Sequence, residues 1–88
     1  MQPMSRFEAT AATQLHALIA DLRWRVQLLD ADIKEEERKA GVSDPASLAY
    51  PMLAVTLRGR RDNLQATVAT LQRQLEAIAP SADWGRAA

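Results

Sequence analysis

Apolar residues recur along the first half of the chain at alternating spacings of four and three, the pattern of a helix that buries one stripe. In a heptad labelled a to g, β-branched residues take the a positions of this stripe and leucines take the d positions. The stripe consists of Leu15, Ile19, Leu22, Val26, Leu29 and Ile33. We expect a helix over about residues 5–40, begun by a capping box in which Ser5 is the N-cap and Glu8 reaches back to it.

The same rhythm returns in the second half and predicts a second helix over about residues 51–79. It is interrupted once, at an a position that Arg61 occupies. Its apolar members are Leu53, Leu57, Leu64, Val68, Leu71, Leu75 and Ile78. Pro80 cannot continue a helix, so we expect residues 80–88 to form a flexible tail, whose Trp84 docks on the helices or stays loose.

The segment between the two stripes, AGVSDPASLAYP, carries one glycine and two prolines. Gly41 suits the left-handed residue that follows many helix C-termini, and Ser43 or Asp44 is expected to cap a short helical turn. Two long helices joined by so short a turn fold back on each other. The sequence therefore predicts a single all-α domain over residues 1–88, an antiparallel, coiled-coil-like two-helix hairpin with its turn at residues 41–50.

Some apolar side chains of the first helix lie away from its stripe, notably Trp24 and Leu28. A hairpin with one seam cannot bury a second apolar side, and a chain this short gains little burial against its conformational entropy. We expect it to form a homodimeric four-helix bundle, with Leu18, Trp24 and Leu28 at the interface. Two alternatives stay open: a helical partner of different sequence, or scattered surface residues with no partner.

The stretch LRGRR, residues 57–61, places three arginines around Gly59. If facing residues of the hairpin have numbers that add to about 91, Arg61 lies beside Asp30, at the start of the acidic stretch DADIKEEE. We expect the acidic stretch to pair with the arginines, and Arg61 to fix the register at some cost in stability. Gly59 marks either a kink or close helix contact, or a tolerated glycine.

The alternative function for the same arginines is a phosphate-binding patch, made by Arg58, Arg60 and Arg61, in a nucleic-acid-binding bundle. Eleven basic and eleven acidic residues cancel, however, so the chain lacks the net positive charge typical of such proteins. Nucleic acid is therefore the less favoured partner, behind a second copy or another helical protein.

Candidate chemistry is sparse in this sequence. There is no cysteine, and His16, the single histidine, has Thr13 where a metal-binding helix would carry a carboxylate. We expect no catalytic residue, metal, cofactor or small-molecule substrate. The predicted function is a non-enzymatic interaction module, a small scaffold, adaptor or chaperone-like subunit.

The expected location follows from two absences. No uncharged run approaches the length of a membrane span, and the N-terminal residues do not resemble a secretory signal. We therefore expect a cytoplasmic protein. Its basic residues are mostly arginine, a usage typical of GC-rich bacterial genomes.

Overall fold

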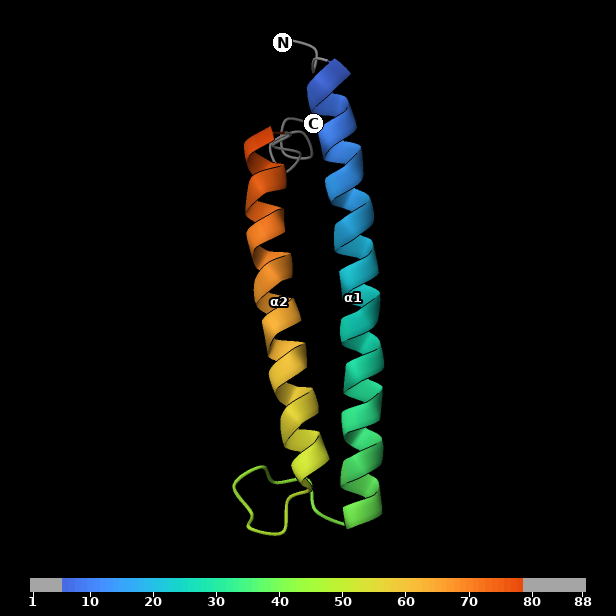
Figure 1. The fold of residues 1–88 in the computed structure, drawn as a ribbon, viewed down its shortest axis with the longest axis vertical. Coiled ribbons are helices and arrows are strands. Elements are labelled where there is room, and N and C mark those ends of the chain that lie inside the picture. The colour runs from blue at the N-terminus through green and yellow to red at the C-terminus, as the bar shows by residue number, and fades with distance from the viewer. Residues whose placement is uncertain (1–5, 79–88) are drawn as a thin grey trace, which may run out of the picture.

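The computed structural model describes residues 6–78 as two antiparallel α-helices that lie side by side, with side chains described for residues 10–78 (Figure 1). Helix α1 spans Arg6–Ala40 and helix α2 spans Met52–Ile78. The predicted all-α hairpin is confirmed, and no strand occurs among the described residues. The expected N-cap Ser5 and the tail that carries Trp84 lie outside the described residues.

The two helices differ in length, with 35 residues in α1 and 27 in α2. At 1.5 Å per residue, α1 is about 12 Å longer. The turn holds the other two ends level, so the N-terminal end of α1 extends beyond α2 (Figure 1).

Helix α1 ends in a Schellman motif. Gly41 has a φ of 69°, in the left-handed region, and its N–H donates to the carbonyl of Arg38 over 3.2 Å. The next N–H, that of Val42, donates to the carbonyl of Glu37, also over 3.2 Å. These two bonds satisfy carbonyl groups that would otherwise lack partners at the end of the helix. The left-handed residue predicted at Gly41 is thus confirmed.

The connection to α2 consists of two consecutive hydrogen-bonded turns instead of the expected short helical turn. In the first, the N–H of Ser47 donates to the carbonyl of Asp44, whose carboxylate also accepts from the N–H of Ala46. In the second, the N–H of Tyr50 donates to the carbonyl of Ser47, whose hydroxyl accepts from the N–H of Ala49. Side-chain acceptors of this kind favour turns over helix continuation, which explains the difference.

The core is a single layer of apolar side chains between the helices. Its main cluster lies toward the open end of the hairpin, and a smaller buried group lies near the turn. The main cluster contains Ala12, Ile19, Leu22, Val68 and Leu75, and the group near the turn contains Ile33, Tyr50 and Ala54. No large side chain among the described residues is completely buried, because each has a neighbouring helix on one side alone.

The two described glycines, Gly41 and Gly59, differ in backbone conformation, so replacing each by alanine tests which of them needs a left-handed φ. A β-carbon at Gly41 or Gly59 would contact nothing within 4 Å, so no close helix contact explains either glycine. We expect Gly41→Ala to lower the free energy of unfolding by about 1 kcal/mol, since alanine is strained at positive φ. Gly59→Ala lies inside α2 and should raise it by about 0.5–1 kcal/mol.

Urea unfolding followed by circular dichroism, at equal protein concentration, measures both changes. Effects of the same sign in the two variants would contradict the assignment of Gly41 as the left-handed residue.

Candidate interaction surface

The heptad positions divide the hairpin into two broad faces. Around each helix, the e and b positions lie on the side of the a position, and the g and c positions lie on the side of the d position. In an antiparallel pair, the a, e and b side of one helix lies next to the a, e and b side of the other, and likewise for d, g and c. We call the side formed by the a, e and b positions of both helices the covered face. The side formed by the d, g and c positions is the open face.

The a positions are well buried. Six of the eight are buried and the other two are half-buried. These positions are Ala12, Ile19, Val26 and Ile33 in α1, and Ala54, Arg61, Val68 and Leu75 in α2. The row of d positions behaves differently: Leu22 is buried and the other seven are half-buried. These are Leu15, Leu22, Leu29 and Glu36 in α1, and Leu57, Leu64, Leu71 and Ile78 in α2.

An ion pair between the two helices helps to shield the seam from water on the covered face. The guanidinium of Arg61 donates to the Asp30 carboxylate over 3.0 Å and also pairs with Asp62 at 3.0 Å. These hydrogen bonds raise the pKa of Arg61, so it stays charged although its side chain is 19% exposed. The predicted pairing of Arg61 with Asp30 is confirmed, and it places residues whose numbers add to 91 at the same level.

Nearer the turn, Tyr50 closes the covered face. It is buried at 9% exposure, and its hydroxyl donates to the Glu37 carboxylate over 2.7 Å. Burial, followed by this hydrogen bond, raises the pKa of Tyr50, and a hydrogen bond with Arg58 opposes the rise in part. The contact ties the turn to the last part of α1. Sequence reasoning missed this role, although a single tyrosine in a short turn is a usable signal.

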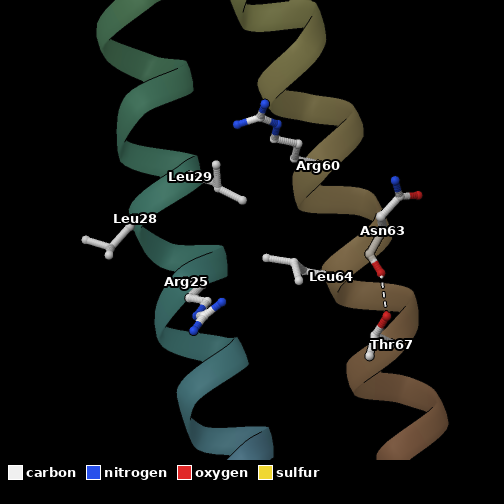
Figure 2. A pocket seen from close by; sticks show the side chains of 7 residues that line it. All are labelled: Arg25, Leu28, Leu29, Arg60, Asn63, Leu64 and Thr67. Atoms are coloured by element: carbon white, nitrogen blue, oxygen red, sulfur yellow. Dashed lines mark hydrogen bonds between the residues drawn. The ribbon is translucent and has the colours of Figure 1, made fainter.

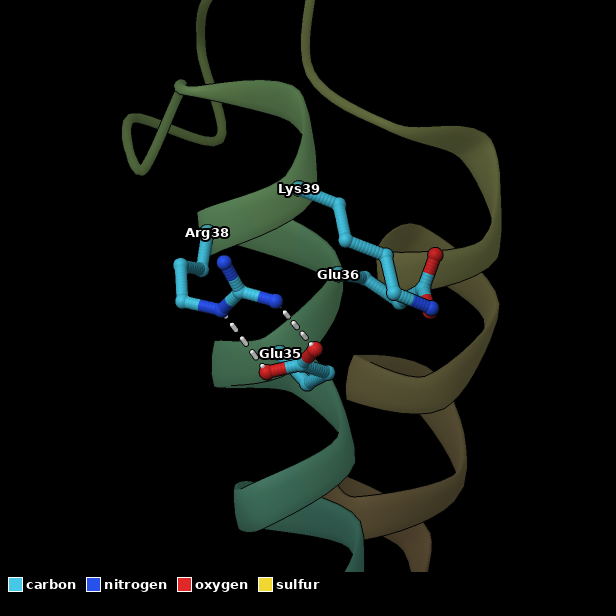
Figure 3. A network of polar contacts seen from close by, with 4 residues as sticks. All are labelled: Glu35, Glu36, Arg38 and Lys39. Atoms are coloured by element: carbon cyan, nitrogen blue, oxygen red, sulfur yellow. Dashed lines mark hydrogen bonds and ion pairs between the residues drawn. The ribbon is translucent and has the colours of Figure 1, made fainter.

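The remaining acidic residues pair mostly within their own helix. Arg38 makes two hydrogen bonds to Glu35, of 3.0 and 2.6 Å, and Lys39 pairs with Glu36 at 3.4 Å (Figure 3). The hydrogen bond from Arg38 lowers the pKa of Glu35. The expectation that the whole acidic stretch faces the arginine cluster is therefore wrong beyond Asp30. Glu35 and Glu36 each have a basic residue three positions later on the same helix, a spacing at which side chains of one helix meet.

Among the described residues, no ion pair or side-chain hydrogen bond joins the two helices on the open face, and large apolar side chains lie on it. Leu18 is 44% exposed, Leu28 47% and Leu53 53%. Leu53 was expected in the seam, but Ala54, one residue later, is the buried residue there, at 0% exposure. Together with the half-buried leucines at d positions, these side chains form an apolar band along the hairpin.

A groove of about 510 Å³ lies in the middle of the open face. Leu29 and Leu64 point toward each other across its floor, and Leu28 lies on the outer side of α1 (Figure 2). Arg25 and Arg60 also line the groove, and Arg25 pairs with Asp21 at 3.1 Å. The grooves on the covered face are smaller, about 300 and 280 Å³, and mainly polar side chains line them.

The predicted interface residues do not all lie on one face. Leu18 and Leu28 occupy g and c positions of the open face, while Trp24, 58% exposed, lies on the back of α1, one helical turn from Leu28. It therefore borders the open face. Three further exposed apolar side chains, Leu48, Met52 and Val55, lie near the turn and outside the open face.

The three arginines predicted as a phosphate patch are divided between the faces. Arg58 lies beside Tyr50, and Arg61 is held by two carboxylates, both on the covered face. Arg60 lines the groove of the open face. The hairpin thus does not bring the three guanidinium groups together.

The described residues offer little for chemistry. Within residues 10–78, no three His, Asp or Glu side chains are grouped so as to hold a metal ion. His16 lines a shallow groove with Arg23 and Glu76. Neither described helix is apolar over a length sufficient to cross a membrane.

Comparisons of the chain with protein-family models, curated proteins and solved structures found no match. Inference about function therefore rests on the surface of the hairpin itself.

The ion pair between the helices is testable by a double-mutant cycle. We expect Asp30→Ala and Arg61→Ala to show a coupling free energy of about 0.5–1 kcal/mol, because the pair is only partly shielded from water. Urea unfolding of the wild type, both single variants and the double variant measures it. The pair Asp21→Ala and Arg25→Ala, within one helix and more exposed, is the control and should couple less. Equal coupling in the two cycles would contradict a special role for Arg61.

The contact of Tyr50 predicts a pH dependence. Because the folded-state pKa is raised, the stabilisation is complete below the unfolded-state pKa of about 10 and is lost as the pH rises through the folded-state pKa. We expect Tyr50→Phe to be less stable than the wild type at pH 7, and the difference to shrink above pH 10. Thermal unfolding from pH 7 to pH 11 measures it. A difference that stays constant with pH would contradict the contact with Glu37.

Proposed function

We propose that this protein is a non-enzymatic protein–protein interaction module that acts through self-association. The observation that carries the proposal is the difference between the two rows of the seam: six of eight a positions are buried, whereas seven of eight d positions are only half-buried. A one-layer hairpin gains burial when a second layer packs on its apolar side. A helical scaffold, adaptor or chaperone-like subunit works through such a surface.

The location of the apolar groove supports the same proposal. It lies on the open face, its lining includes Leu28, Leu29 and Leu64, and it is open to solvent. Leucines and a peripheral tryptophan on one flat side are the composition expected of a helix-packing surface. Leu18 and Leu28 belong to the proposed interface, and Trp24 lies at its edge.

Multi-angle light scattering over a range of concentrations tests self-association. We expect a dimer whose mass does not change between low and high salt, because burial of apolar surface does not depend on ion pairing. Leu28→Gln, which makes the open face polar, should shift the equilibrium toward monomer. Met52→Gln changes an exposed apolar residue outside the open face and is the control.

A monomer at every concentration would refute self-association. A dimer that Met52→Gln dissociates and Leu28→Gln does not would place the interface elsewhere. Circular dichroism of each variant shows whether the helices are retained.

A further inference from the structure

In the described part of the chain, two charged side chains on the open face have no ion-pair partner. Asp32 occupies a g position of α1 and Arg60 a g position of α2, and both are exposed. Among the described residues, neither forms a side-chain hydrogen bond or an ion pair with another, whereas Asp21, Arg25 and Glu35 on the same side of α1 do. Asp32 and Arg60 therefore remain available to a molecule that covers this face.

The register of the hairpin places these two residues at nearly the same level. Arg61 and Asp30 are in contact, and Arg60 precedes Arg61 by one position while Asp32 follows Asp30 by two, so Arg60 and Asp32 lie within about one residue of each other along the axis. At that level the open face thus carries a negative charge on α1 and a positive charge on α2.

From this we infer that the open face binds a second copy of the chain with both turns at the same end, so that Asp32 of each copy pairs with Arg60 of the other. This inference rests on the proposed self-association and specifies its geometry. In this arrangement the twofold axis runs parallel to the helices and keeps every residue at its level. Helix α1 of one copy then packs on α2 of the other. The four charges form a layer in which each carboxylate has a guanidinium on both sides.

The opposite arrangement, with the turns at different ends, does not use these charges. It would pack α1 on α1 and α2 on α2, so Arg60 would face only the open side of a second α2. The g and c positions of α2 along that side carry no carboxylate; besides Arg60 they are Leu53, Thr56, Asn63, Thr67, Thr70, Gln74 and Ala77. Charge complementarity therefore favours turns at the same end.

The size of the open face suits a second copy. It is as long as α2, about 40 Å, and two helices wide, about 20 Å, which gives about 800 Å². Each partner of a stable interface of standard size contributes about that area. Full overlap of the two copies is possible only when their helices run along each other, as in a four-helix bundle.

Charge reversal tests the pairing. Asp32→Lys leaves four positive charges in the layer, and Arg60→Glu leaves four negative ones. Each homodimer should weaken by on the order of tenfold in Kd at low salt, and an equimolar mixture should form a heterodimer in preference to both homodimers. Native mass spectrometry of the mixture, with one variant tagged, measures the preference. Reversal of Arg25 instead, as Arg25→Glu, should not produce it, because Arg25 pairs with Asp21 of its own helix.

Labels in the turn test the orientation independently. The chain has no cysteine, so Ser43→Cys gives a single attachment point in the exposed turn. Spin labels there should lie within about 30 Å of each other if the turns share one end, and more than about 40 Å apart if they do not. A dimer with the long distance and no preference for the mixed pair overturns this arrangement and leaves self-association standing. A monomer in light scattering overturns both.

Discussion

Two helices contact each other along one line, and this limits how much apolar surface each helix can bury. Each side chain in the seam has the other helix in front of it, but it depends on longer neighbours for cover above and below. Among the described residues, the polar side chains that join α1 to α2 or to the turn lie on one side only, where Arg61 reaches Asp30 and Tyr50 reaches Glu37. The other side keeps its leucines half-exposed. The position of the remaining apolar surface follows from where the long polar side chains lie.

The Arg61 layer fixes the alignment on which both faces depend. A slip of one heptad that brings Ala54 to the level of Asp30 would place Arg61 beside Arg23 and separate its partly buried guanidinium from the Asp30 carboxylate, which would destabilise that register. The layer also divides the core into the main cluster and the group around Ile33 near the turn. An apolar residue at that position would bury more surface, but it would discriminate less between registers.

The heptad pattern of the sequence was sufficient to predict the two helices, the glycine that ends α1 and the pairing of Arg61 with Asp30. It could not decide between Leu53 and Ala54, because either residue continues a spacing of three or four back from Leu57, and packing near the turn selected the smaller one. Nor could it predict that Glu35 and Glu36 pair within α1, since the geometry of a helix side competes there with the facing helix. The difference between the faces depends on Tyr50, which lies in the turn and outside any periodic pattern.

A surface that is apolar on one side has a consequence for the size of the assembly. If both faces of the hairpin were apolar, copies could stack without limit, because every added layer would present a new apolar side. Here a second copy on the open face would leave only covered faces outward, with Arg23, Asp62 and Gln65 exposed to water. Pairing would therefore end at two copies. The hairpin's stability would then increase with protein concentration, since the dimer buries leucines that the single hairpin leaves in contact with water.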